Sequence, residues 1–268
     1  MRKIVSTLCI LAMIAGCNSN SPTNTNAPAS GTVYLWISSD KDAYASCGAT
    51  ASCEEQLRNF GTHNQLVVAD WEFAHKRSYV HFPIPTLPDS TEILEAYIEL
   101  FHSGKNEDGK SDDILIPVAL SFAAWSPLTL NWSNKPEGTN PPGSHFSLKL
   151  ESQAWSGSPD ITGWVKQIFA NPSTFFGFTF WWSQQMNGGL GIEKGFYSNN
   201  DLSRTQNDLG KAPRLLLKLK LPSGKTTNDI TLPFFAPDND LTNLPRPTTM
   251  MLFRSGSDWP SDWNVSFR

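Results

Sequence analysis

Short runs of alternating apolar and polar side chains dominate the sequence and constrain its fold more than any other feature. In the first run, Val33, Leu35 and Ile37 fall on one face of a strand, and Tyr34 and Trp36 fall on the other. The same period recurs over residues 78–82, 96–102, 113–120, 175–182 and 214–221. Clusters rich in Pro, Gly, Asn and Asp separate the runs and are typical of turns. The pattern predicts antiparallel strands.

One segment, residues 160–172, has the period of a helix instead. Asp160 or Thr162 can cap its start, and Asn171 followed by Pro172 ends it. The apolar face of this helix consists of Trp164, Val165, Ile168 and Phe169. Strands do not alternate with helices elsewhere in the sequence. We therefore expect an all-β fold, an antiparallel β-sandwich with one short helix.

The N-terminus has the features of an export signal. Arg2 and Lys3 precede an apolar run over residues 4–15, which is shorter than the roughly 20 residues that a membrane-spanning helix needs. Gly16 and Cys17 then resemble the bacterial lipobox, in which the cysteine is acylated and becomes the first mature residue. We expect residues 1–16 to be a lipoprotein signal peptide and Cys17 to be the lipidation site; simple secretion is the alternative.

Residues 17–31 are rich in Ser, Thr, Asn and Pro and predict a flexible spacer. The lipid chains on Cys17 would hold the chain to a membrane, so the expected location is the bacterial cell envelope. Asn18 stands where Gram-negative lipoproteins that stay in the inner membrane usually have Asp, which favours the outer membrane if the cell is Gram-negative.

Charge and cysteine content exclude some classes of function. Without residues 1–16 the chain keeps 19 of its 21 basic residues against 25 acidic ones, so nucleic acid is not an expected partner. Cys47 and Cys53 are expected to form a disulfide outside the cytoplasm, with free thiols as the alternative. Sequence neighbours that would complete a zinc site with them are absent.

The strands predict a sandwich over residues 32–220. The following residues, 221–268, contain several Pro- and Asp-rich stretches between short apolar pieces. This loop-rich C-terminal extension is either a further layer on the sandwich or a small appendage.

Short motifs in a fixed order carry a resemblance to a known family. They are DAY at Asp42–Tyr44, NFG at Asn59–Gly61, RSYVHF at 77–82, LTLNWSNKP at 128–136 with Trp125 upstream, DITGWV at 160–165, FFGFTF at 175–180 and the segment 196–220. From Asp42 to Leu219 the chain resembles the DNRLRE domain, which is grouped with the family 96 carbohydrate-binding modules. The resemblance implies a jelly-roll β-sandwich that binds polysaccharide, notably acidic polysaccharides such as alginate.

Arg77, Tyr79 and His81 form the first candidate ligand-binding set. Because Val80 and Phe82 suit the core, the three residues should lie together on the opposite face of their strand. A guanidinium pairs with a carboxylate through two hydrogen bonds, so the set would suit an acidic, uronate-containing sugar. The alternative is that Arg77 is structural and pairs with a buried acid such as Asp42 or Asp160.

Tryptophans form the second set of candidates. Trp181 should be turned away from the face shared by Phe176, Phe178, Phe180 and Trp182. Trp36 should face out of the first strand, and Trp71 should lie in a loop beside His75, Lys76 and Arg77. Each could stack on a sugar ring, or could be covered by the C-terminal segment or the spacer.

Other functions have weaker support in the sequence. Asn106, Asp108, Asp112 and Asp113 could bind a structural calcium or form a solvated turn, so no metal ligands and no cofactor are assigned. Neither a pair of catalytic carboxylates nor a Gly-x-Ser-x-Gly motif stands out, so we expect a module that is not an enzyme. A structural or adhesion lipoprotein that contacts a protein partner at the cell surface is the alternative to polysaccharide binding.

Three structural observations would separate these classes. Exposed aromatics beside basic groups on one sheet face would favour sugar binding, whereas a broad apolar patch would favour a protein partner. Two carboxylates that converge in a deep cleft would favour an enzyme.

Overall fold

A computed structural model describes most of the chain between residues 31 and 255. The described residues are 31–48, 53, 55–71, 74–103, 114–121, 123–139, 145–148, 155–182, 193–199, 211–231 and 251–255. The predicted signal peptide, spacer start and Cys17 lie outside them. None of the helices in the described part is long and apolar enough to cross a membrane.

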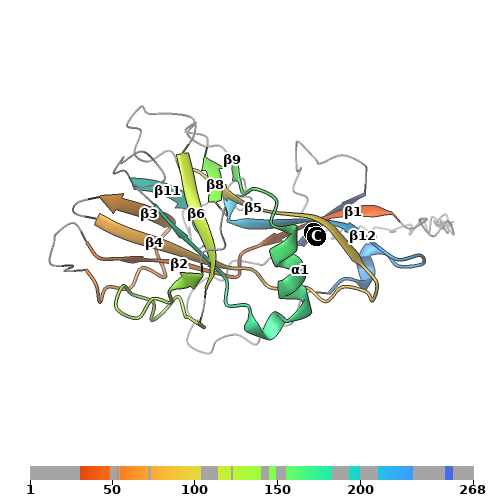
Figure 1. Cartoon of the computed structure of the whole chain (residues 1–268), viewed down its shortest axis with the longest axis horizontal. Coiled ribbons are helices and arrows are strands. Elements are labelled where there is room, and N and C mark those ends of the chain that lie inside the picture. The colour runs from red at the N-terminus through yellow and green to blue at the C-terminus, as the bar shows by residue number, and fades with distance from the viewer. Residues whose placement is uncertain are drawn as a thin grey trace, which may run out of the picture.

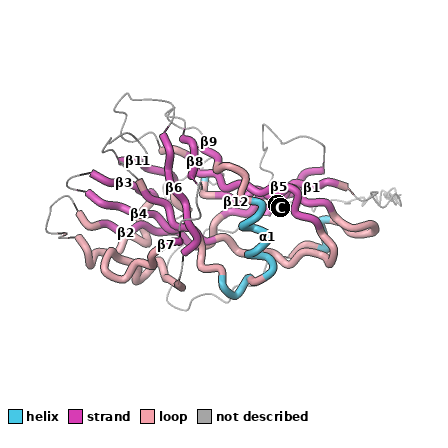
Figure 2. The backbone as a smooth tube through the Cα atoms, in the orientation of Figure 1, coloured by secondary structure: helices cyan, strands magenta, loops and turns pink. Residues whose placement is uncertain are grey.

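Two antiparallel sheets contain almost all of the regular structure (Figures 1 and 2). The five-stranded sheet has the order β13-β1-β12-β5-β9. Its strands are β1 (Thr32–Ser38), β5 (Glu92–Phe101), β9 (Trp155–Gly157), β12 (Arg214–Lys220) and β13 (Met251–Ser255). The strand β13 comes from the predicted C-terminal extension and pairs with β1, so this part of the extension joins the sandwich.

The second sheet has eight strands, in the order β11-β3-β4-β10-β6-β7, with β2 paired to β4 and β8 to β6. Its strands are β2 (Lys41–Ser46), β3 (Gln65–Trp71), β4 (Ala74–His81), β6 (Ile114–Ser121), β7 (Gly138–Thr139), β8 (His145–Leu148), β10 (Phe178–Trp181) and β11 (Glu193–Tyr197). The predicted all-β sandwich of antiparallel sheets is thus confirmed; its jelly-roll connectivity stays a prediction.

The core lies between the sheets and takes the side chains that the alternation assigned to it. Val33, Leu35 and Ile37 of β1 pack in one apolar cluster with Val80 and Phe82. The helix α1 (Thr162–Ala170) adds its predicted apolar face to this cluster. Two short 3-10 helices, Pro172–Thr174 and Thr227–Asp229, also lie in the described part.

The sandwich is elongated, and its two ends differ (Figure 1). The paired ends of β3 and β4 lie at one end of the long axis, and the start of β1 lies toward the other. There the carbonyl of Gly31 accepts a hydrogen bond from the backbone N–H of Leu221. The chain therefore enters the fold far from the β3–β4 end.

Candidate functional site

A pocket of about 250 Å³ opens at the ends of β3, β4 and β10. We call it the tryptophan pocket. Its lining consists of Ala69, Asp70, His75, Lys76, Arg77, Trp132, Trp181 and Trp182. It therefore joins the ends of three sheet strands and a loop tryptophan, Trp132, that is far from all three strands in the sequence.

The sheet register positions the basic side chains of the pocket. His75 of β4 lies opposite Asp70 of β3, and Arg77 lies opposite Trp181 of β10. Facing residues of antiparallel strands have neighbouring side chains on one face of the sheet. The register thus places the Trp181 indole beside the Arg77 guanidinium.

Trp132 reaches the pocket from residues 127–137, which we call the covering segment. The Asn131 side-chain oxygen accepts hydrogen bonds from the backbone N–H groups of Ser133 (2.9 Å) and Asn134 (3.1 Å). The Asn134 side-chain oxygen in turn accepts one from the Asn131 backbone (2.8 Å). Such side-chain to backbone bonds stabilise a tight turn. They fix the turn that carries Trp132 at the pocket rim.

The Asn-Phe-Gly motif holds the start of the covering segment. The side-chain amide of Asn59 donates to the carbonyls of Pro127 (2.7 Å) and Leu130 (2.8 Å). Gly61 lies so close that a Cβ atom there would be 1.6 Å from the carbonyl oxygen of Pro127. Only glycine allows this approach of two backbones.

Acidic side chains contact the basic side chains around the pocket. His75 Nδ1 lies 2.7 Å from Asp70 Oδ1, and Lys76 Nζ lies 2.5 Å from Glu193 Oε2. Arg77 Nη1 lies 2.5 Å from Glu137 Oε2. These pairs hold the basic groups in place without closing the pocket.

Glu137 also accepts a hydrogen bond from Lys135, at 2.9 Å. This bond is the main cause that lowers the pKa of Glu137, and the bond from Arg77 adds to it. The Trp132 ring has Lys135 Nζ 4.4 Å and the Arg77 guanidinium 5.6 Å from its centroid, so both cations lie over an aromatic face.

Only Arg77 of the first predicted set lines the pocket, although all three residues share the predicted face. Tyr79 is fully buried below the covering segment, where its hydroxyl donates to the Pro136 carbonyl (3.1 Å). Burial also raises its pKa above the usual range. His81 pairs with Asp40 (2.6 Å) and stacks on Phe175. Tyr79 and His81 therefore do not extend the pocket.

The proposed structural partners of Arg77 are wrong, because its partner is Glu137. The buried carboxylate of Asp42 instead accepts hydrogen bonds from Ser39, Ser198 and the backbone of Asn199. Asp160 accepts from the backbone N–H and the hydroxyl of Thr162, next to the start of α1.

The predicted tryptophans have three different environments. Trp181 is half-buried and lines the pocket, while Phe178, Phe180 and Trp182 lie in the core. The prediction that Trp36 faces outward is wrong: its side chain is 0% exposed, and the Arg214 guanidinium lies 5.5 Å from the centroid of its ring. Trp71 is the last residue of β3, opposite Ala74, and not in a loop.

Cys47 and Cys53 form a disulfide in the structure. The backbone N–H of Cys47 donates to the carbonyl of His75 (2.9 Å), so the disulfide loop borders the pocket strand. The loop considered for calcium, 106–113, lies outside the described residues. Within the described part, no three His, Cys, Asp or Glu side chains gather as metal ligands would.

Trp132, Lys135 and Glu137 were not among the predicted site residues. A signal for Trp132 was present, because it lies in the motif LTLNWSNKP. Glu137 pairs with a residue 60 positions earlier, and nothing in the local sequence announces that contact.

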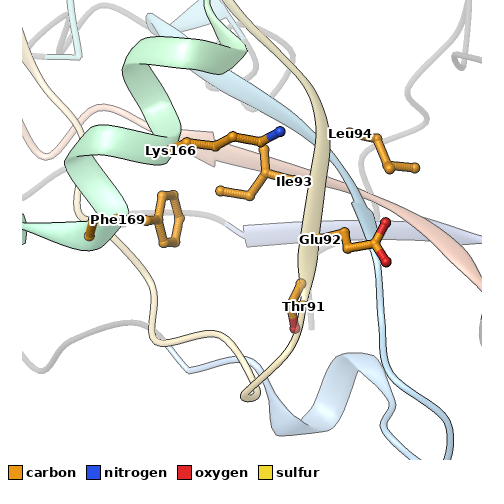
Figure 3. Close-up of a pocket in the computed structure, with 7 residues that line it drawn as sticks. Thr91, Glu92, Ile93, Leu94, Lys166 and Phe169 are labelled. Atoms are coloured by element: carbon orange, nitrogen blue, oxygen red, sulfur yellow. The ribbon is translucent and has the colours of Figure 1, made fainter.

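A second pocket, of about 530 Å³, lies between α1 and the start of β5 (Figure 3). Figure 3 shows Ile93 pointing toward the helix, where Phe169 and Lys166 lie, and Leu94 and Glu92 pointing away from it. Glu92 pairs with Lys220 at 3.0 Å. This pocket has one aromatic residue in its lining and no tryptophan, so it offers a poorer stacking surface than the tryptophan pocket.

Fold and pocket together define a β-sandwich protein with an aromatic and basic pocket at one end of a sheet. The chain belongs to carbohydrate-binding module family 96, whose model matches residues 33–209, more than half of the sequence. The match runs from β1 through β11. No curated protein matches the chain.

Proposed function

We propose that the chain binds polysaccharide in the tryptophan pocket and is not itself an enzyme. The observation that carries the proposal is that Trp132 and Trp181 flank the Arg77 guanidinium in one pocket. Indole rings stack on the apolar faces of sugars, and charged donors bind hydroxyl or carboxylate oxygens. Membership of a carbohydrate-binding family supports the same function.

Two further observations support this proposal over its alternatives. Among the described residues, only Leu57 and Leu94 are large apolar side chains that are exposed, which disfavours a broad protein-binding patch there. The lining of the tryptophan pocket has one carboxylate, Asp70, and the neighbouring Glu137 and Glu193 carboxylates are paired with Arg77 and Lys76. The lining of the second pocket has one carboxylate, Glu92, whereas glycoside hydrolysis commonly uses two that flank one bond.

We further propose that the ligand is an acidic, uronate-containing polysaccharide and that the chain is a lipoprotein anchored through Cys17 in the bacterial cell envelope. Arg77 supports the first proposal, because a guanidinium can bind a ligand carboxylate. The sequence of residues 1–17 supports the second.

Affinity-gel electrophoresis against uronate and neutral polysaccharides tests the function. We expect retardation by a uronate polymer, and at least about tenfold weaker binding in Trp181→Ala and Arg77→Ala. Trp164→Ala and Arg58→Ala, which change the same residue types away from the pocket, should bind as the native chain does. If no glycan retards the chain, the proposal fails and a protein partner becomes the better candidate.

A further inference from the structure

We propose that Glu137 determines how well the tryptophan pocket accepts a ligand carboxylate, because its own carboxylate lies where a uronate carboxylate would bind. The inference rests on the proposed polysaccharide binding. Glu137 Oε2 lies 2.5 Å from Arg77 Nη1, and its Oε1 lies 2.9 Å from Lys135 Nζ. One carboxylate thus holds both cations that flank the Trp132 ring.

The exposed fractions of Glu137, Arg77 and Lys135 show which of these three side chains can most readily separate from the other two. The Glu137 side chain is 62% exposed, whereas those of Arg77 and Lys135 are 31% and 12% exposed. The cations are therefore held by the fold, and the carboxylate projects into solvent. An ion pair of such an exposed group contributes little stability, so the group can be exchanged for another carboxylate.

Glu193, the acidic partner of Lys76 at the same pocket, is held more firmly than Glu137. Glu193 lies in β11 opposite Ala69 and is 30% exposed, and its partner Lys76 is 19% exposed. Strand pairing keeps the Glu193 backbone fixed on the sheet. Glu137 instead lies directly before the two-residue strand β7, at the end of the covering segment.

A uronate and a neutral sugar then meet different obstacles. A neutral ring can stack on Trp132 or Trp181 while Glu137 remains bound to Arg77 and Lys135. A uronate carboxylate must replace Glu137 or accept its repulsion at short range. When Glu137 is neutral, Arg77 and Lys135 leave two uncompensated positive charges beside Trp132.

Glu137→Gln is the direct test, because glutamine keeps the shape and one acceptor oxygen but loses the charge. We expect Glu137→Gln to bind alginate or polygalacturonate roughly tenfold more tightly than the native chain, with a steeper loss of affinity as salt rises. The affinity is measured by titration calorimetry with oligomers of each polymer.

Glu92→Gln is the matched control, because Glu92 is also exposed (59%) and paired with a lysine, but lies at the other pocket. An equal gain in Glu92→Gln would mean that net charge alone acts, and would overturn the role of Glu137. Unchanged or weaker uronate binding in Glu137→Gln would overturn it as well.

Failure of the underlying function has a different signature. If Trp181→Ala, made in the native and the Glu137→Gln backgrounds, leaves binding intact in both, the ligand does not use this pocket and both proposals fail. If Trp181→Ala abolishes binding but Glu137→Gln has no effect, the pocket is right and only the inference about Glu137 is wrong.

Discussion

Asp42 joins segments that are far apart in the sequence through one buried carboxylate. It accepts hydrogen bonds from Ser198 Oγ (2.7 Å), the Asn199 backbone (2.6 Å) and Ser39 Oγ (3.2 Å). We expect Asp42→Ala to lower the free energy of unfolding by about 2–4 kcal/mol, because buried donors lose their acceptor. Urea unfolding measures the change, and Asp89→Ala at an exposed position should have little effect. Equal effects of the two variants would contradict this role.

Glu137 has a pKa below its usual value, and the hydrogen bond from Lys135 is the larger favourable cause. A carboxyl whose pKa is lower in the folded state stabilises the fold above its unfolded pKa, and loses that contribution as the pH falls through its folded pKa. The group is exposed, so the contribution is small.

Carbon NMR titration of Glu137 tests this cause. We expect Lys135→Ala to raise the pKa of Glu137 toward the ordinary value, and Arg77→Ala to raise it less. The reverse order would show that Arg77 is the main partner.

At the scale of strands and loops, the alternation of side chains predicted on which face of a strand each residue lies. It did not predict what covers that face. It assigned Val33, Leu35 and Ile37 to the core and turned Trp181 away from it. It also placed Trp36 on the other face of its strand, but a period of two says nothing about what lies over a face. Trp36 was therefore predicted to be open and is buried.

The covering segment explains why the rest of the site was missed. It buries Tyr79 and brings Trp132 and Glu137 to the pocket through contacts between distant parts of the sequence. Local periodicity contains no information on such contacts. The family motifs did contain such information, because Asn59 and Gly61 of the motif NFG hold the start of the covering segment.

Two glycines test how closely the covering segment is held. We expect Gly61→Ala to lower the free energy of unfolding by more than about 2 kcal/mol, because its Cβ would overlap the Pro127 carbonyl. Gly163→Ala in α1, where nothing lies within 4 Å, should instead stabilise the fold by about 0.5–1 kcal/mol. Chemical denaturation of both variants measures the contrast, and similar values would contradict the close approach.

The disulfide Cys47–Cys53 closes a short loop directly after the end of β2, beside His75. We expect the double variant Cys47→Ser, Cys53→Ser to lose about 2 kcal/mol of stability, as loop-closure entropy predicts for so short a loop. Native protein under reducing conditions should match the variant in urea unfolding. A variant as stable as the oxidised native chain would contradict the prediction.

On the scale of the whole molecule, the tryptophan pocket lies at the β3–β4 end, and the chain enters at the other end (Figure 1). We expect the protein to keep its polysaccharide binding when it is coupled to beads through its N-terminus. Coupling through Ser133→Cys, beside Trp132, should block binding because the bead then covers the pocket. Equal capture by both bead types would contradict this arrangement.

The separation of the two ends has a consequence for many copies on one surface. Copies held by their N-terminal side would all present their pockets outward, so one long polymer could occupy several pockets at once. Each further contact is then intramolecular, and avidity can exceed the affinity of a single pocket by about a hundredfold or more. A crowded layer of such molecules would retain long chains firmly while it releases short oligosaccharides.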